Sequence, residues 1–387
     1  MLLQLVRTHQ GISRVELAAL MSVAPSTIGI FVSRLLKENF LLENEVLRLK
    51  RGRPRTALSL NPGGGYLLGV DIEANRIRAV CLDFREEIQD SVSISIRPDA
   101  DVEEVLKLAR DAVLRILPKN RSRILGLGVA APGSIDIKQR TSSFYKYIKG
   151  WENVQIGSFF EKNFNFPVYL ESNMRAMASA ELWFGQGRAA DQFVSIVVRS
   201  GMGAGIVTQG KVCKGAHQSA GEIGFWLCPA AVLDRQVIKN IFRSNPAHIE
   251  LEEIASVRAV LRNIATCIRD GQPSSLSECG LHITVNDLLE AYRKGDKMTV
   301  SHLNAAADGL GWAAGQINVL LDPGKIIFSS PFMALGQTFL DRIRRKATEH
   351  VRERHLSAPE IVASELGEFS GALGAAAQIV HHWVPVR

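Results

Sequence analysis

The chain has 387 residues, 46% of them hydrophobic and 22% charged, which suits packed cores in two or three domains and excludes a disordered chain. No run of about 18 apolar residues predicts a transmembrane helix. The opening MLLQLVRTHQG lacks the basic start and cleavage site of a signal peptide, so we expect a cytoplasmic protein with no membrane partner. The five cysteines are scattered and form no C-x-x-C pair, which argues against a disulfide framework.

The net charge of +7 is concentrated at one end of the chain. Residues 1–60 contain nine basic and four acidic side chains, a net charge of +5, and the rest of the chain carries only +2. Because net charge informs about partners rather than about fold, this asymmetry points to a polyanion bound by the N-terminal segment.

Two helices are predicted within residues 1–60. Ser13 and Glu16 form a capping-box pattern that starts a helix over VELAALM. This helix is expected to place three apolar residues on one face: Leu17, Leu20 and Met21. Pro25 suits the first turn of a second helix. The second helix is expected to bury Ile28, Val32, Leu35 and Leu36. Two helices joined by a short turn form the helix-turn-helix arrangement, whose second helix reads the major groove.

The next stretch, LLENEVLRLKRGRPRTALSL, alternates apolar residues around a basic turn, as a winged β-hairpin does. Arginines on a narrow loop suit DNA phosphates or an A·T-rich minor groove. We therefore predict that residues 1–60 are a winged helix-turn-helix domain that binds a double-stranded DNA operator. The alternative is a solvated basic hairpin beside a small helical bundle. The predicted DNA contacts are Arg14, Ser26, Thr27, Arg34, Arg51, Arg53 and Arg55.

Residues 61–65, Asn-Pro-Gly-Gly-Gly, are predicted to be a linker. Residues 66–190 begin with strand-like runs, YLLGVDI and IRAVCLDF, before a helical pattern and a third strand, ILGLGVAAPG. Residues 191–367 repeat this style with FVSIVV, GAGIVTQGKVC and, later, KIIFSS. Two units that each open with strand, turn and strand predict an α/β body of two lobes with a cleft between them.

The order of motifs resembles one known family. GRPRTALSLNP, LLGVDI, GLGVAAPGSID, LESNMRAMASAELWFGQG, GMGAGI, AGEIGF, INVLLDP and GALGAAAQIV together resemble the ROK family (repressor, open reading frame, kinase) over practically the whole chain. The resemblance implies a winged helix before an actin-like sugar-kinase fold, with residues from about 368 to 387 packing back on the first lobe. Family members are ATP-dependent sugar kinases or sugar-responsive transcription factors.

Departures from the kinase motifs distinguish these two activities. Where family kinases have D-I-G-G-T, this chain has a carboxylate, Glu73, facing the expected phosphates; at an effective dielectric near 20 it would oppose binding by roughly 4 kcal/mol. Asn173 stands where the family has its catalytic Asp, and an amide cannot accept the proton of a sugar hydroxyl. The turn at 199–203 and the segment at 329–331 depart from two further glycine-rich motifs. We therefore predict no enzyme activity and no cofactor.

The zinc motif of the family also departs, because Phe225 replaces its His and only Cys228 is near. One thiolate cannot complete a four-ligand shell, so we predict no metal. The adjacent His381 and His382 are expected at the surface. The second acidic residue that helps members of the family to bind sugar has no clear match.

Four residues match sugar-contacting positions of the family or stay polar there: Gly133, Ser134, Asn173 and Glu222. They imply a sugar or sugar-derivative effector, and Phe225 is expected either to stack on it or to fill an emptied pocket. We predict a sugar-responsive repressor acting as a homodimer or tetramer. The alternatives are an ATP-dependent sugar kinase with an appended DNA-binding module and a scaffold that oligomerises without a ligand.

Overall fold

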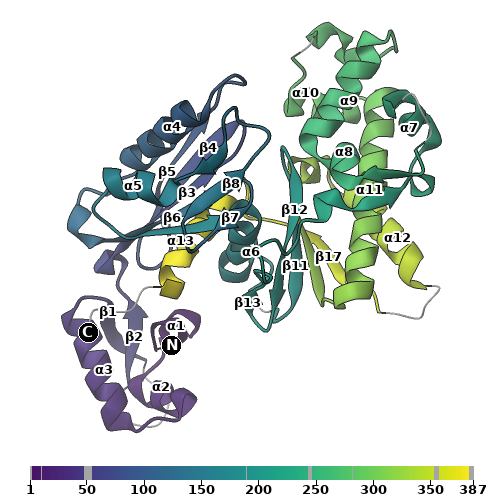
Figure 1. Cartoon of the computed structure of the whole chain (residues 1–387). Coiled ribbons are helices and arrows are strands. Elements are labelled where there is room, and N and C mark those ends of the chain that lie inside the picture. Colours follow the sequence, from purple (N-terminus) through teal and green to yellow (C-terminus); the bar gives the residue numbers. More distant parts are fainter. Residues whose placement is uncertain are drawn as a thin grey trace.

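Three helices and a two-stranded antiparallel sheet form the N-terminal module (residues 2–60; Figure 1). The computed structural model describes residues 2–9, 11–47, 55–188, 190–242, 246–280, 282–352 and 357–382. The elements of the module are α1 (Leu2–Thr8), α2 (Arg14–Met21), α3 (Pro25–Lys37), β1 (Leu41–Leu47) and β2 (Arg55–Leu60). Their apolar faces meet in one core around Leu17, Ile28, Val32 and Leu58.

The ends of α2 and α3 follow from their capping residues. Ser13 and Glu16 form the expected capping box at the start of α2. Ala24 precedes α3 without a side-chain cap, and Pro25 occupies its first turn. Leu20, expected to share one face with Leu17 and Met21, is 54% exposed, so that apolar face is only partly covered. The unforeseen α1 and the neighbouring α3 pack on α2 through Leu17 and Ala18 instead.

Residues 61–65, predicted as a linker, form a structured junction. Pro62–Gly64 is a 3-10 turn capped by Asn61. The side-chain amide of Asn61 also donates a hydrogen bond of 2.8 Å to the carbonyl of Asn39. The N-terminal module is further fixed to the body by the side chain of Arg7, whose Nε lies 2.7 Å from a carboxylate oxygen of Glu86. The Arg7 guanidinium also stacks 3.9 Å from the ring of Trp183 and donates to its carbonyl. We call these three residues the Arg7 junction.

The first lobe is built on five strands: β3 (Tyr66–Ile72), β4 (Arg76–Leu82), β5 (Ile88–Ser95), β6 (Ile124–Ala131) and β10 (Val168–Ser172). Their order in the sheet is β10-β6-β3-β4-β5, with β3, β6 and β10 parallel and β4 antiparallel to both of its neighbours. Successive side chains of β3 alternate between faces, so that Leu68 packs under α4 (Val102–Arg115) and α5 (Ile156–Asn163), and Leu67 faces the other side. A small sheet of β7 (Ile135–Asp136), β8 (Thr141–Phe144) and β9 (Glu152–Val154) extends this lobe.

The second lobe repeats this topology. Its sheet contains β11 (Phe193–Val198), β12 (Met202–Thr208), β13 (Lys211–Val212), β16 (Lys325–Ser329) and β17 (Glu360–Ala363). In the order β13-β12-β11-β16-β17, the antiparallel pairs β11–β12 and β12–β13 again lie on one side of β11, and the parallel strands β16 and β17 lie on the other. The two sheets are therefore built alike, as the repeated strand pattern in the sequence suggests.

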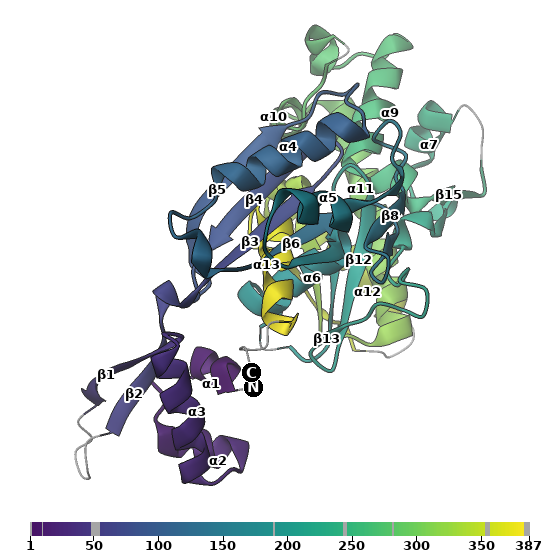
Figure 2. The same ribbon diagram turned by 60° about the vertical axis from the view of Figure 1, so that its left-hand side comes forward.

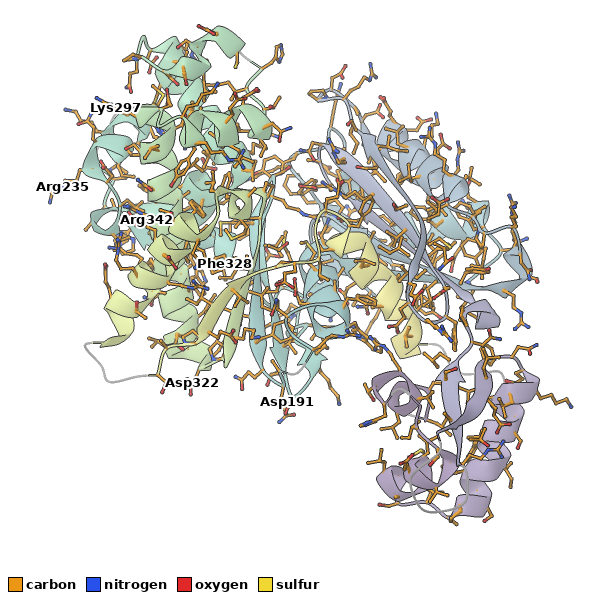
Figure 3. All side chains as sticks on the ribbon, turned by 180° about the vertical axis from the view of Figure 1, so that it is seen from behind. Asp191, Arg235, Lys297, Asp322, Phe328 and Arg342 are labelled. Atoms are coloured by element: carbon orange, nitrogen blue, oxygen red, sulfur yellow. The ribbon has the colours of Figure 1, made fainter. Side chains whose placement is uncertain are left out.

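Helices cover one side of the second sheet (Figures 1 and 2). They are α7 (Arg235–Phe242), α8 (Leu251–Ala255), α9 (Val257–Arg269), α10 (Val285–Arg293), α11 (Lys297–Leu321) and α12 (Gln337–Arg352), with a hairpin of β14 (Leu227–Pro229) and β15 (His248–Glu250). Phe328 of β16 is fully buried beneath them, and Arg342 of α12 donates two hydrogen bonds, of 2.8 and 2.7 Å, to Asp308 of α11 (Figure 3).

Two small-residue helices join the lobes. The helix α6 (Asn173–Phe184) packs on β11 and β12, and α13 (Ser370–His382) returns to pack on β3 and β6, with the two helices against each other. Glycines permit this close approach, since a Cβ at Gly69 or Gly128 would overlap the backbone of α13. The cleft between the lobes opens at the N-terminal end of α6.

Candidate functional site

A cavity of about 590 Å³ lies between the lobes and is lined by all four predicted ligand-binding residues. Gly133 and Ser134 come from the loop after β6, Asn173 from the start of α6, and Glu222 from the segment before β14. Gly133 has a φ of +78°, and a Cβ there would overlap the backbone of Phe144, so this loop requires glycine. The fold thus brings together residues that lie 89 positions apart in the sequence.

The side chain of Asn173 is held from inside the protein. Its amide nitrogen donates to Oδ1 of Asp71 at 3.1 Å and to the carbonyl of Ile72 at 2.8 Å. These two bonds use both N–H groups of the amide, so the side chain offers an acceptor oxygen to the cavity rather than the donor and acceptor pair expected from the sequence.

A second carboxylate in the cavity was missed by the sequence analysis. Glu252 at the start of α8 accepts hydrogen bonds from the Tyr147 hydroxyl at 2.6 Å and from the backbone N–H of Met202 at 3.3 Å. Lys146 lies 2.8 Å from the same carboxylate. The sequence showed no clear match for the family's second acidic residue, but the fold places Glu252 in the same cavity as Glu222. The only signal was the acidic run at 250–253, far along the chain from the motif that contains Glu222.

Phe225 lies at the edge of this cavity and is 62% exposed. It does not fill the space left by a missing ligand-binding histidine, and its ring is available on the cavity side. With Phe144, which is also exposed there, it gives the cavity an apolar rim above a polar floor. Such a combination suits a ligand that has both hydroxyl groups and an apolar face.

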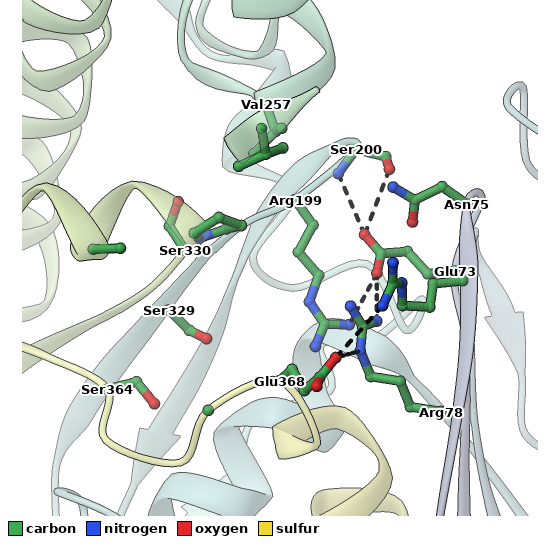
Figure 4. Close-up of a pocket in the computed structure, with 15 residues that line it drawn as sticks. Glu73, Asn75, Arg78, Arg199, Ser200, Val257, Ser329, Ser330, Ser364 and Glu368 are labelled. Carbon is green, nitrogen blue, oxygen red and sulfur yellow. Dashed lines mark hydrogen bonds and ion pairs between the residues drawn. The ribbon is translucent and has the colours of Figure 1, made fainter. Parts of the chain in front are cut away.

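A neighbouring cavity of about 400 Å³ contains a network of ion pairs (Figure 4). Arg78 lies 2.9 Å from Glu73 and 3.4 Å from Glu368. From the second lobe, Arg199 lies 2.5 Å from Asp71 and 3.6 Å from Glu73. Burial lowers the pKa of Arg199, but the attraction of the two carboxylates outweighs it and raises the pKa above its ordinary value. The network therefore links both lobes with charged side chains of the chain itself.

The residues of this second cavity do not fit a nucleotide. Glu73 is buried, and one of its carboxylate oxygens lies 3.5 Å from both the N–H and the hydroxyl of Ser200, in the turn that matches a phosphate motif of family kinases. Ser329 and Ser330 line the same cavity where that family has glycines. A phosphate chain here would have to displace the carboxylates of Glu73 and Glu368 from the arginines that line the cavity, since Arg78 and Arg199 already pair with them.

Cys228 is the one cysteine near the segment that corresponds to the zinc motif of the family. It is buried, and burial raises the pKa of its thiol to about 12. A thiol in this state is a poor metal ligand. Among the residues that the structure describes, no three His, Cys, Asp or Glu side chains are grouped as a metal site would require. His381 and His382 are the last residues of α13.

The predicted DNA contacts of the N-terminal module are only partly described. Ser26 and Arg34 are exposed on α3, Thr27 is half-buried beside them, and Arg14 begins α2. Both arginines have acidic partners, Glu43 at 2.7 Å from Arg14 and Glu38 at 2.9 Å from Arg34. Three further predicted contacts, Arg51, Arg53 and the side chain of Arg55, lie outside the described residues.

The helices α2 and α3 are bent by 119° relative to each other. This lies at the upper end of the range for a helix-turn-helix, about 90–120°. Within the described ranges no single helix has the length and apolar composition to cross a membrane, and this bent pair passes that test only when its two helices are taken together.

The family model of ROK proteins matches residues 67–382, which is most of the chain. The chain belongs to the ROK family. It is 24% identical to the xylose repressor of Caldicellulosiruptor bescii over 98% of this chain and 94% of that protein. It is 25% identical to the glucokinase of Thermotoga maritima over 81% of this chain and 96% of the kinase.

Among solved structures, a ROK family transcriptional regulator homologous to the E. coli MLC protein matches with a TM-score of 0.77 at 24% identity. The match covers 98% of this chain and 94% of the regulator. The α/β fold of this ROK protein is thus shared with regulators and sugar kinases. The comparisons include repressors that match nearly the whole chain and kinases that match a shorter part of it.

Proposed function

We propose that this ROK protein is a DNA-binding transcriptional repressor that responds to a sugar or sugar derivative. The observation that carries the proposal is the difference in coverage: the xylose repressor matches 98% of the chain, whereas the glucokinase matches 81%. Since the family model begins at residue 67, the part outside it is mainly the basic N-terminal module. A repressor of this kind acts in the cytoplasm on the chromosome.

The DNA-binding part of the proposal is a winged helix-turn-helix over residues 1–60. The 119° bend between α2 and α3 supports it, as does the exposure of Ser26 on α3. Ser26 and Thr27 would contact base edges, with Arg14 and Arg34 nearer the phosphates. The arginines at 51, 53 and 55 would enter the minor groove. Arg14 and Arg34 would then exchange their acidic partners for phosphate.

The effector part of the proposal rests on the larger cavity. Glu222 and Glu252 offer acceptors for hydroxyl hydrogens, Asn173 offers one more, and Ser134 can both donate and accept. Three carboxylates, Glu73, Glu222 and Glu252, outnumber two cationic side chains in the cavity lining, which favours a neutral polyhydroxy ligand over an anion. Phe225 can stack on the apolar face of a sugar ring.

The proposal includes the absence of kinase activity. In the alternative, a sugar kinase with an appended DNA-binding module, Asn173 would have to replace a general base, and its amide is already bound to Asp71. ATP would also have to displace the ion pairs of Glu73 with Arg78 and Arg199. Both features oppose the alternative.

We further propose four functional segments. Residues 1–60 would bind DNA, 61–65 would connect, and 66–190 and 191–367 would form the lobes, with residues from about 368 onwards packing on the first. A homodimer or tetramer would place two α3 helices about one DNA turn, ~34 Å, apart on a pseudo-palindromic site. The helix α6 runs from Asn173 in the cavity to Trp183 at the Arg7 junction, so ligand binding at one end could change module docking at the other.

A mobility-shift experiment with the full chain tests the proposal. The protein is used to select duplexes from a random pool, and binding is then measured with and without pentoses and hexoses. Replacing Thr27 and Arg34 with alanine should weaken binding at least tenfold, whereas Arg269→Ala, which removes an exposed charge from the second lobe, should not. No selected duplex, or a sugar-dependent release of ADP from ATP, would refute the proposal.

A further inference from the structure

Ile30 on α3 is 71% exposed although it is apolar. The buried residues of this helix, Ile28, Val32 and Leu35, lie within a narrow arc. At 3.6 residues per turn, Ile30 is nearly opposite that arc. Its side chain therefore points directly away from the core of the N-terminal module and contributes little to folding.

Apart from Phe31 beside it in the chain, the helix neighbours of Ile30 are polar or basic. One turn before it are Ser26 and Thr27, and one turn after it are Ser33 and Arg34. An apolar side chain set among hydroxyls and a guanidinium is a poor match for a protein partner, whose interface core would be depleted of charge. The net charge of +5 over residues 1–60 instead complements a polyanion. In the major groove of DNA, the apolar group at the base edges is the C5-methyl of thymine.

Gly29 beside it is a second unexplained feature. Glycine inside a helix destabilises it relative to alanine. Gly29 needs no special backbone angle, and a Cβ built on it would meet no atom within 4 Å. The described structure therefore contains no packing reason for glycine here. A partner that approaches the helix backbone closely would supply one.

We propose that Ile30 reads a thymine methyl group in the major groove and that Gly29 lets the backbone of α3 approach the bases there. This inference rests on the proposed DNA-binding function. It adds an apolar, sequence-reading residue to the polar contacts predicted at Ser26 and Thr27. Each half-site of the operator would then contain one thymine whose methyl contributes to affinity.

Deoxyuridine substitution tests this directly, because it removes only the methyl. The full-length protein first selects its duplexes from a random pool, and each thymine of the selected site is then replaced singly by deoxyuridine. At one position per half-site the affinity should fall about fourfold, the value expected for one buried methyl. The Ile30→Ala variant should bind the thymine and deoxyuridine duplexes equally. Phe31→Ala, a matched control that removes a neighbouring 52% exposed side chain, should keep the preference.

The outcomes separate the two proposals. If the protein selects no duplex, the proposed function fails. If it binds DNA but no thymine is sensitive, or if Ile30→Ala keeps the full preference, the inference about Ile30 is overturned. If Ile30→Ala binds too weakly to measure, Ile30→Val decides, since its shorter side chain should reduce the preference and an unchanged preference contradicts the inference. Gly29→Ala should raise the midpoint of thermal unfolding yet weaken DNA binding. If this variant binds DNA as tightly as the parent, the proposed role of Gly29 is overturned.

Discussion

Replacing Arg7 with methionine perturbs the contact between the N-terminal module and the body. In the native protein the Arg7 guanidinium lies 2.7 Å from Glu86, whose side chain is only 8% exposed. Burial raises the pKa of Glu86 to about 7, although Arg7 lowers it. Methionine keeps much of the apolar contact with Trp183 but removes the guanidinium that pairs with Glu86, so that only the more weakly acting Arg188 remains near this carboxylate.

The pKa of Glu86 sets how its contribution to docking depends on pH. A rise from 4.5 to about 7 corresponds to roughly 3 kcal/mol, at about 1.4 kcal/mol per pKa unit. Because the docked state holds this proton more tightly, docking is fully favoured below pH 4.5 and weakens as the pH rises through 7. Without Arg7 the pKa rises further, so docking keeps weakening above pH 7. At pH 8 we expect a loss of about 3 kcal/mol, the lower end for breaking a buried ion pair, since protonation of Glu86 limits the penalty.

Hydrogen exchange followed by mass spectrometry measures this loss. Peptides that contain residues 84–87 and 183–187 should lose protection in Arg7→Met at pH 8 and much less at pH 6, after correction for the intrinsic exchange rate. The double variant Arg7→Met/Glu86→Gln removes both charges and should regain most of the protection. Equal protection in the parent and Arg7→Met at pH 8, or no recovery in the double variant, would refute the reasoning.

Three further predictions concern the rest of the chain. Asn173→Asp restores a carboxylate at the base position but should yield no sugar-dependent ADP release in a coupled assay, because Glu73 still faces the phosphates; turnover above background contradicts this. Ala24→Ser supplies the missing cap of α3 and should raise the unfolding free energy of the module by about 1 kcal/mol in thermal melts, and an unchanged melt argues against it. Gly128→Ala should destabilise the body by about 1–3 kcal/mol through overlap with Ala375 of α13, with Gly63→Ala as the neutral control; equal melts would show that α13 can shift.

Sequence patterns within one helical turn predicted much of the local structure. The capping box at Ser13 and the proline at the start of α3 depend on residues within one helical turn, and both are present in the structure. The exposure of Leu20 could not be predicted, because the side of α2 that is covered depends on α1 and α3. The junction at 61–65 was read as a linker because its glycines and proline suit one, but contacts with distant residues give it a defined structure.

In the candidate site, too, features set by local motifs were predicted and those set by distant contacts were not. Motif resemblance identified Gly133, Ser134, Asn173 and Glu222, and the fold brings all four to one cavity. Glu252 was not predicted as a site residue, because its neighbours in space, Tyr147 and Lys146, lie more than 100 residues away in the sequence. No periodicity or spacing encodes such a contact.

The ROK resemblance, the location of the positive charge in residues 1–60 and an amide at position 173, where the family motif has an Asp, can all be read from the sequence, because each depends on which residue occupies a position. What surrounds such a position in space follows from the tertiary structure alone. Glu73 reads in sequence as an isolated charge that repels phosphate, but in the fold it is paired with Arg78 and, across the cleft, with Arg199. A buried charge is stable only where the fold supplies opposite charges, and here Arg78 comes from the same lobe and Arg199 from the other.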